Sequence, residues 1–381
     1  MTPSTGNATC RECCWPSRGS ANTKAWCTGW TDYSGCRTGG RVKRPRVAIV
    51  GATGLVGQEF IRILEQRRFP MASIRLYASD RSTGKTLQVK GQRIEVKETT
   101  EDSFDGIDIA LFSAGADISR RFSPLAAQAG ATVIDNSSAF RMEPDVPLVV
   151  PEVNPEDIEG HGGIIANPNC STIQMVVALH PLHQVNPIKR VTVSTYQSVS
   201  GTGSAAVEEL RIQSASVLNG SGVVARVYPY QIAFNVLPEI DVFMENGYTK
   251  EEWKLVEETR KIMHAPDMAI SATCARVPVV IGHSEAVQIE FTQPMSAQEA
   301  RELLRQAPGV KVMDDPAARV YPYPTFAAGR DEVFVGRIRQ DSSHPNGLVL
   351  WIVSDNLRKG AALNAVQIAE EVLRRAGSRQ C

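Results

Sequence analysis

The chain has 381 residues, of which 43% are apolar, so it can bury the cores of about two domains. Its 41 basic residues balance 41 acidic ones, which excludes an overall field that would attract nucleic acid or an anionic membrane. No apolar run approaches the roughly 20 residues that span a bilayer, and the first forty residues lack the apolar core of a signal peptide. We therefore expect a cytoplasmic globular protein.

Residues 1–43 differ in composition from the rest. They hold five of the eight cysteines, three of the five tryptophans and only two acidic residues. A zinc site is one interpretation, because Cys10 and Cys13 form a C-x-x-C pair that Cys27 and Cys36 would complete. Irregular spacing and the lack of histidine count against it. A disordered extension or a misassigned start codon is favoured, and a transit peptide stays open.

Short β-branched runs begin at residue 46 and alternate with amphipathic segments. The runs cover residues 46–50, 74–79, 107–114, 131–137 and 163–168, with amphipathic segments at 56–68 and 118–130. Strands alternating with helices predict a parallel, doubly wound α/β sheet of the Rossmann type with right-handed crossovers. We assign residues 44–169 to this nucleotide-binding domain.

After a predicted helix at 171–183, the apolar runs lengthen and alternate. They cover residues 190–200, 285–294, 332–341 and 347–355, and alternation indicates half-buried strands. This favours an α+β second domain over residues 170–354, with a mostly antiparallel or mixed sheet. Residues 356–375 have the apolar spacing of a helix. We expect the segment 355–381 to pack back on the first domain and complete it.

A glycine-rich segment, GATGLVG at residues 51–57, joins the first strand to the first helix. Glycines in this context let backbone amides and the helix N-terminus approach a pyrophosphate. We therefore expect the whole segment to bind a dinucleotide, through Gly51, Thr53, Gly54, Leu55, Val56 and Gly57. A turn that only packs helix on strand is the alternative.

The second predicted strand ends in the polar sequence YASDRSTGK. Asp80 stands where NAD enzymes place a carboxylate on the ribose 2′-hydroxyl. Ser79, Arg81 and Ser82 around it are donors that suit a 2′-phosphate. We therefore favour NADP over NAD, although Arg81 is also consistent with an ordinary solvated loop charge.

Cys170 follows an Asn-Pro-Asn turn between a strand and a predicted helix. The positive end of the helix dipole lowers the pKa of a thiol placed there, which predicts a reactive thiolate. A thiolate that attacks an aldehyde gives a thiohemiacetal, and loss of hydride to a nicotinamide leaves a thioester. Cys274 has no such setting, and we expect it in the core of a strand.

Eight segments together resemble the aspartate-semialdehyde dehydrogenase family, in order and at the family's spacing. They are GATGLVG, SAGADIS, DNSSAFRM, VPLVVPEVN, ANPNCSTIQ, STYQSVSG, CARVPVVIGH and VSDNLRKGAA. The resemblance covers nearly all of the chain from Arg46 to the final helix. It implies roles for residues that carry no clear signal of their own.

His283 is a natural general acid or base, but a lone histidine is equally consistent with a core or surface position. The resemblance makes it the family's acid/base and makes Cys170 the nucleophile. It further implies that Gln197 orients the acyl intermediate and that Arg276 binds the substrate α-carboxylate, which suits an arginine fork. The remaining implied roles are phosphate binding by Arg141 and Lys254 with Asn169 beside them, amine binding by Glu251, and cofactor binding by Ser200, Gly201 and Asn356. We expect Glu251 and Lys254 to lie on an exposed helix.

The resemblance implies an NADP-dependent enzyme that interconverts 4-phospho-L-aspartate and L-aspartate 4-semialdehyde, without a metal. Its product would feed lysine, diaminopimelate, methionine, threonine and isoleucine synthesis, and its partners would be substrate, phosphate and further copies in a homodimer or homotetramer. An N-acetyl-glutamyl-phosphate reductase is the closest alternative enzyme. A non-catalytic paralogue is the alternative from another class, and the presence of all four residues Cys170, Gln197, Arg276 and His283 argues against it.

Overall fold

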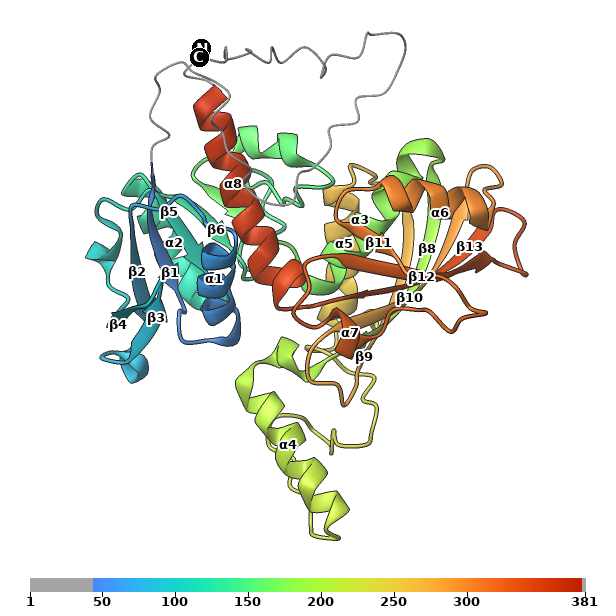
Figure 1. The fold of residues 1–381 in the computed structure, drawn as a ribbon, viewed down its shortest axis with the longest axis horizontal. Coiled ribbons are helices and arrows are strands. Elements are labelled where there is room, and N and C mark those ends of the chain that lie inside the picture. Colours follow the sequence, from blue (N-terminus) through green and yellow to red (C-terminus); the bar gives the residue numbers. More distant parts are fainter. Residues whose placement is uncertain (1–43, 379–381) are drawn as a thin grey trace, which may run out of the picture.

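The computed structural model describes residues 44–378, so the predictions for residues 1–43 lie outside the described residues. Two sheets stand side by side in Figure 1, and helix α8 runs next to the first of them. The strands of the first sheet are β1 (Arg46–Val50), β2 (Ser73–Ala78), β3 (Thr86–Val89), β4 (Gln92–Glu98), β5 (Ile109–Phe112), β6 (Thr132–Asp135) and β7 (Ile164–Ala166).

The first sheet has the order β3-β4-β2-β1-β5-β6-β7 and is parallel except for the β3–β4 pair. Successive residues of β1 enter two separate cores, with Val47 and Ile49 on one face and Ala48 and Val50 on the other. Helices α1 (Leu55–Gln66) and α8 (Leu363–Ser378) cover the first face, and α2 (Ala116–Gln128) covers the second. Burial on both faces explains the continuous apolar runs of these strands.

The second sheet has the order β11-β12-β13-β10-β8-β9. Its β8–β9 and β11–β12 pairs are parallel and the others antiparallel, which confirms the predicted mixed sheet. The strands are β8 (Ile188–Gln197), β9 (Ala269–Arg276), β10 (His283–Phe291), β11 (Val310–Val312), β12 (Val333–Gln340) and β13 (Gly347–Ser354).

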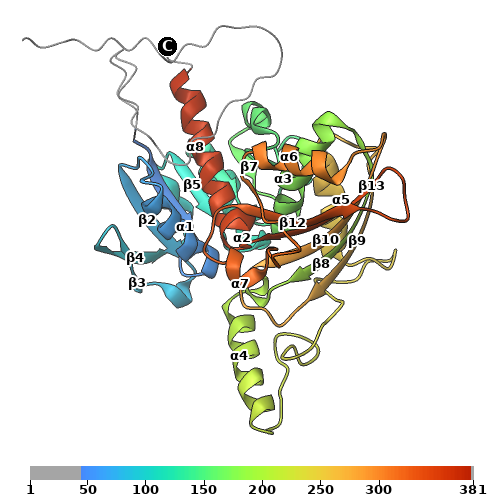
Figure 2. The ribbon, with the colours of Figure 1, turned by 45° about the vertical axis from the view of Figure 1, so that its right-hand side comes forward.

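One face of this sheet packs on α3 (Cys170–Val185), α5 (Lys250–Ile262) and α6 (Ala297–Gln306), which share its apolar core. Cys274 lies fully buried in that core, as predicted. The short α7 (Pro324–Ala327) covers part of the other face, where Tyr196 and Trp351 pack together and Tyr196 stays 38% exposed. Helix α4 (Ser204–Leu218) and the segment after it project away from both sheets (Figure 2).

The chain returns to the first sheet through a π-helix, Arg358–Ala362, that leads directly into α8. The buried apolar residues of α8 share one core with α1 and β1, so the last helix packs back on the first sheet as predicted. The two-domain α/β fold is thus confirmed, while the residue limits 44–169, 170–354 and 355–381 stay a prediction. None of the helices in residues 44–378 has the length and apolarity needed to cross a membrane.

Candidate active site

The turn that carries Cys170 lies between β7 and α3. Asn169 has an extended backbone, and its side-chain oxygen accepts hydrogen bonds from the amides of Ser171 at 3.0 Å and Thr172 at 3.3 Å. It is therefore the N-cap of α3, a position that asparagine favours. Cys170 is consequently the first residue of the helix, one residue before the expected start.

A cavity of about 380 Å³ opens beside Cys170. Ten of the residues predicted for the site line it: Val56, Arg141, Asn169, Cys170, Gln197, Gly201, Glu251, Lys254, Arg276 and Asn356. They come from both sheets and from the helices between them. The fold thus brings together residues that are up to 300 positions apart in the sequence, as Val56 and Asn356 are.

The predicted lowering of the Cys170 pKa is wrong for the ligand-free site. Burial raises the pKa of this thiol to about 12, and the nearby carboxylate of Glu251 adds to the effect. Arg276 and Arg141 act in the opposite direction but do not compensate. The helix N-terminus favours a thiolate, yet the loss of water around the sulfur costs more. The side chain of Cys170 is therefore a neutral thiol near neutral pH.

His283 is fully buried at the start of β10. Its Nδ1 accepts a hydrogen bond from the backbone amide of Ser198 at 3.0 Å, which places the proton of the neutral ring on Nε2. Burial, followed by the charge of Arg276, lowers the pKa of His283 to about 3. The ring is therefore neutral at physiological pH. Its Nε2 has no hydrogen-bond partner within the described part of the chain, and His283 is not among the residues that line the cavity.

Arg276 ends β9 and is held by one hydrogen bond from its Nη1 to the carbonyl of Ser198 at 2.8 Å. Gly201 lies directly against it, because a Cβ at that glycine would stand 3.0 Å from Arg276 Nη1 and 3.4 Å from His283 Nε2. A side chain at position 201 would thus fill the space between the arginine and the histidine. Gly201 is the reason that this part of the cavity stays open.

Helix α5 brings Glu251 and Lys254 to the cavity, although the sequence had suggested that they lie on an exposed helix. Glu251 is only 5% exposed and accepts from Asn169 Nδ2 at 2.8 Å and Gln197 Nε2 at 3.2 Å. Burial alone would raise the pKa of Glu251, but Lys254 and Asn169 outweigh it and keep that pKa below its usual value. Lys254 pairs with Glu251 at 3.1 Å and with Asp241 at 2.8 Å. Both side chains are charged.

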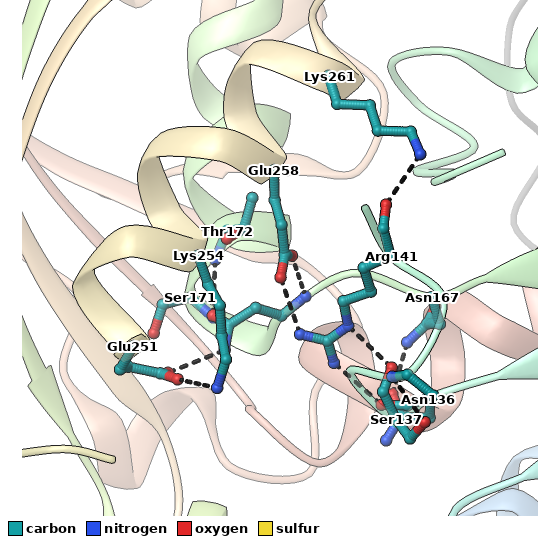
Figure 3. Close-up of polar contacts among 12 residues, drawn as sticks. Asn136, Ser137, Arg141, Asn167, Ser171, Thr172, Glu251, Lys254, Glu258 and Lys261 are labelled. Carbon is teal, nitrogen blue, oxygen red and sulfur yellow. Dashed lines mark hydrogen bonds and ion pairs between the residues drawn. The ribbon is translucent and has the colours of Figure 1, made fainter. Parts of the chain in front are cut away.

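Arg141 reaches the cavity from the loop after β6. Its guanidinium donates to three fixed acceptors: the carbonyls of Ser137 and Asn136 and the carboxylate of Glu258, each at 3.0 Å. An arginine has five N–H groups, so two remain for a ligand. Figure 3 shows Glu258, on α5, facing Arg141. The arrangement is a fixed cationic fork that suits an anion with several oxygens.

The glycine-rich turn at residues 51–57 is shaped by close backbone contacts. A Cβ at Gly51 would stand 2.3 Å from the carbonyl oxygen of Ser113, and one at Gly57 would stand 2.1 Å from that of Gly51. Gly54 is the N-cap of α1 and provides no side-chain hydrogen bond there. The first amides of α1 are thus left to bind a pyrophosphate, which fits a dinucleotide.

The predicted 2′-phosphate residues lie at the end of β2, and Thr53 links them to the glycine-rich turn. Thr53 Oγ1 is 3.3 Å from Ser82 Oγ, and the short helical turn Asp80–Ser82 places Ser79 and Arg81 on the exposed rim. The ammonium of Lys85 lies 3.4 Å from Ser82 Oγ and adds a cation that the sequence analysis missed. Asp80 accepts from the amide of Arg81 at 2.8 Å. These donors fit a phosphate better than a free hydroxyl.

Ser200 and Asn356 form a buried pair across the two halves of the chain. Asn356 donates to Ser200 Oγ at 2.9 Å, and its own oxygen accepts from Ser198 Oγ at 3.0 Å and the amide of Gly282 at 2.8 Å. Asn356 lines the cavity together with Val56 of the glycine-rich turn, whereas Ser200 is not among the lining residues.

Sequence reasoning missed two residues that contact this site. Gly360, in the π-helix, lies against the nucleophile, since a Cβ there would stand 3.0 Å from Cys170 Cβ. Glu258 contacts Arg141 and Asn169. Asn169 belongs to the turn at residues 167–170 that carries Cys170, which is called the nucleophile turn below. Only the spacing of Glu251, Lys254 and Glu258 on one helix face would have suggested the second of these. No cluster of metal-binding side chains occurs within residues 44–378.

Two protein-family models match the chain. The model described as semialdehyde dehydrogenase, NAD binding domain, covers residues 46–161, and the model described as semialdehyde dehydrogenase, dimerisation domain, covers residues 179–359. Curated relatives match almost end to end. The aspartate-semialdehyde dehydrogenase of Aquifex aeolicus is 59% identical over 85% of this chain and 97% of its own length, and that of Bacillus subtilis is 52% identical over 86% and 96%.

The chain belongs to the aspartate-semialdehyde dehydrogenase family.

Solved structures of this family have the same fold. Aspartate semialdehyde dehydrogenase II from Vibrio cholerae, described as complexed with ASA, superposes with a TM-score of 0.85 at 48% identity, over 87% of this chain and 99% of that one. The enzyme from Candida albicans, described as solved with NADP, gives a TM-score of 0.68 at 28% identity, over 87% and 98%. The resemblance inferred from eight sequence segments is therefore confirmed.

Proposed function

We propose that this chain interconverts 4-phospho-L-aspartate and L-aspartate 4-semialdehyde with NADP, through a thioester on Cys170. The observation that carries the proposal is the common cavity of Cys170, Gln197 and Arg276, with Arg141 and Lys254 as cations at the same opening. A thiol, a carboxylate-binding fork and a phosphate-binding fork are what an amino-acid acyl phosphate requires. Membership of the aspartate-semialdehyde dehydrogenase family supports the same reaction.

In the biosynthetic direction the sulfur of Cys170 attacks the acyl carbon, the C–S bond forms, the carbon–oxygen bond to phosphate breaks, and the thiol proton leaves with the phosphate. Arg141 and Lys254 stabilise the negative charge on the departing phosphate. Arg276 holds the α-carboxylate and Glu251 the α-amine, so the acyl carbon stays next to the sulfur. Gln197, whose amide nitrogen donates to Glu251 and Thr195, lines the same cavity and would orient the acyl intermediate.

The bound nicotinamide supplies the hydride in this direction and accepts it in the reverse one. Its pyrophosphate would lie on the residue 51–57 turn, its 2′-phosphate near Arg81 and Lys85, and its nicotinamide near Ser200 and Asn356. His283 is neutral and carries its proton on Nε2, so it would donate a hydrogen bond to the oxygen that becomes negative as hydride arrives, and it keeps its proton. When the C–S bond breaks, the aldehyde leaves and the Cys170 thiolate takes a proton from water.

The test is phosphate-dependent reduction of NADP with L-aspartate 4-semialdehyde, followed by the absorbance of the reduced nicotinamide. Native protein should be active, and Cys170→Ala should be inactive but folded. N-Acetyl-glutamate 5-semialdehyde serves as the competing substrate. Preference for the acetylated aldehyde would overturn the assignment of the acyl group, and a folded native protein inactive on both would leave the non-catalytic paralogue.

We also propose that two copies associate through the second sheet. The outer face has a hollow of about 420 Å³ lined by Tyr321, Tyr323 and Trp351, and apolar side chains such as Phe234 and Phe243 are exposed on the projecting segment after α4. Exposed aromatic patches of this kind are typical of protein interfaces. The dimerisation-domain match supports a second copy as the partner. Tyr196→Glu should lower the mass measured by sedimentation, whereas an unchanged mass would exclude this face.

The homodimer or homotetramer, the cytosolic location and the pathways that use the product stay predictions. Loss of lysine, methionine, threonine and isoleucine synthesis together, on deletion of the gene, would agree with the pathway assignment. Loss of only one of them would contradict it.

A further inference from the structure

Four charged residues on α5 lie on the face that meets the site. Glu251, Lys254, Glu258 and Lys261 follow one another at intervals of three, four and three positions, which places them in one row along a helix. Figure 3 shows this row directed at the nucleophile turn and at the loop of Arg141. The roles proposed above use Glu251 and Lys254 and leave Glu258 and Lys261 without one.

Glu258 is 1% exposed, and both of its carboxylate oxygens are occupied. Oε1 accepts from Arg141 Nη1 at 3.0 Å, and Oε2 accepts from the backbone amide of Asn169 at 2.6 Å. Asn169 is the residue before the nucleophile and the cap of its helix. A single carboxylate therefore connects the phosphate fork to the turn that carries Cys170.

Lys261 holds the same loop by its backbone. Its ammonium donates to the carbonyl oxygens of Arg141 at 2.9 Å, Glu143 at 2.8 Å and Val146 at 2.9 Å. Arg141 is thus tied to α5 at both its side chain and its backbone. The loop follows β6 of the first sheet, whereas α5 packs on the second sheet, so these contacts join the two halves of the enzyme.

Within the described residues, Glu258 is the one hydrogen-bond partner of the Arg141 guanidinium that belongs to the second half. The carbonyls of Ser137 and Asn136 fix the guanidinium relative to its own loop, and Lys261 holds the backbone of that loop. A charge-assisted hydrogen bond in a buried setting is short and directional, so it sets position as well as energy. Losing one member would leave a buried charge unpaired.

We propose that Glu258 is a positioning residue for phosphate, which sets the separation between the Arg141 fork and the Cys170 turn. The inference rests on the proposed function, since it takes the anion at Arg141 to be phosphate. Glu258 is not itself among the residues that line the cavity, and it acts through Arg141 and Asn169, which are. It is the residue through which movement between the two halves would change the affinity for phosphate.

The decisive variant is Glu258→Gln, which keeps the shape and removes the charge. The amide offers one acceptor oxygen for two donors, and its N–H₂ faces the other donor. The KM for phosphate should rise at least tenfold, or about 1.4 kcal/mol of binding. The KM for NADP should stay within about twofold, because both hydrogen-bond partners of Glu258, Arg141 and Asn169, lie outside the residue 51–57 turn. A general loss of structure would raise both constants.

Glu257→Gln is the matched control. Glu257 has the same charge on the same helix but pairs with Arg260 at 3.1 Å in a partly exposed position. This variant should leave both KM values unchanged. If Glu258→Gln does not fold, Glu258→Asp keeps the charge and withdraws the oxygens by one methylene, and it should raise the KM for phosphate selectively.

Protection of Cys170 against alkylation by inorganic phosphate gives a readout that needs no turnover. Wild type should be protected at lower phosphate concentrations than Glu258→Gln, by the same tenfold factor. If the wild type is active and Glu258→Gln has an unchanged KM for phosphate, the role of Glu258 is overturned and the proposed function stands. Inactive wild type would overturn the proposed function, while the protection experiment would still report on Glu258: equal protection in both proteins would refute the positioning role.

Discussion

Two strand-to-helix turns lie at the same edge of the first sheet. One leaves the N-terminus of the following helix without a side-chain cap, and the other caps it. The cofactor turn ends at Gly54, which leaves the first amides of α1 without a side-chain cap. The nucleophile turn ends at Asn169, whose side chain caps α3 and whose own amide is bound by Glu258. An open N-terminus binds a ligand, and a capped one holds a side chain in place. One motif therefore serves both binding and catalysis.

The largest expected effect is on the cofactor turn. In Gly57→Ala the new Cβ would stand 2.1 Å from the carbonyl oxygen of Gly51, which cannot move away without opening the turn. We expect a loss of roughly 3 kcal/mol in the free energy of unfolding and a sharply raised KM for NADP. Gly54→Ala, whose Cβ would meet the same oxygen at 3.4 Å, is the structural control. Equal stability losses in urea unfolding would show that close packing does not shape this turn.

The second prediction concerns the charge state at the nucleophile turn. Burial raises the pKa of Cys170 to about 12. As long as the pH stays below that value, the thiolate fraction grows tenfold for each unit by which the pH rises. The alkylation rate of Cys170 by iodoacetamide should therefore increase about 100-fold from pH 7 to pH 9, without a plateau. Mass spectrometry of the peptide that contains Cys170 separates it from the other cysteines. A plateau below pH 8 would mean that the helix dipole outweighs burial after all.

The third prediction removes the cap from the nucleophile turn. Asn169→Ala loses the bonds to the amides of Ser171 and Thr172 and the bond to Glu251. We expect a loss of about 2 kcal/mol in the free energy of unfolding together with a reduced kcat. Asn169→Asp keeps the cap but replaces the amide donor with a second negative charge next to Glu251. It should retain more stability than the alanine variant yet lose as much activity. If Asn169→Asp is instead less stable than Asn169→Ala, the cap does not stabilise this turn.

The smallest expected effect is at the rim of the cofactor site. Arg81 is exposed, so its contribution to a 2′-phosphate is partly screened by water and salt. Arg81→Ala should raise the KM for NADP about tenfold, or about 1.4 kcal/mol, and leave the KM for NAD unchanged. Arg93→Ala, an exposed arginine on β4, serves as the control. Equal changes for NADP and NAD would remove Arg81 from the recognition of the 2′-phosphate.

The cofactor turn could be read from the sequence because its structure is local. Strand, glycines and helix follow one another within some twenty residues, and the close contact between Gly57 and Gly51 is made inside that stretch, although Gly51 also packs against the distant Ser113. The buried parallel strands were predictable for the same reason, since continuous apolar runs indicate burial on both faces. Packing of the last helix on the first sheet followed from its apolar spacing.

The nucleophile turn was harder to predict because distant residues shape it. Its contacts to Glu251 and Glu258 span 82 and 89 positions, and no local pattern indicates them. Charged residues on a helix normally face water, so α5 was taken as exposed, whereas its charges pair with one another and with Asn169 and Arg141. The prediction of a lowered pKa for Cys170 failed for a related reason. The dipole can be predicted from the turn, but the loss of solvent depends on side chains from the other half of the fold.

The late synthesis of helix α8 affects how the first sheet folds during translation. The helix contributes Leu363, Val366 and Ile368 to the core that also contains Val47 and Ile49 of β1, and the ribosome makes it after every other described element. Until that helix is made, α1 covers just part of this face of the first sheet and the rest of its apolar surface stays exposed, while the second sheet already has all of its strands. The domain that begins first is therefore completed last, and during translation a chaperone would have most to cover on the cofactor-binding half.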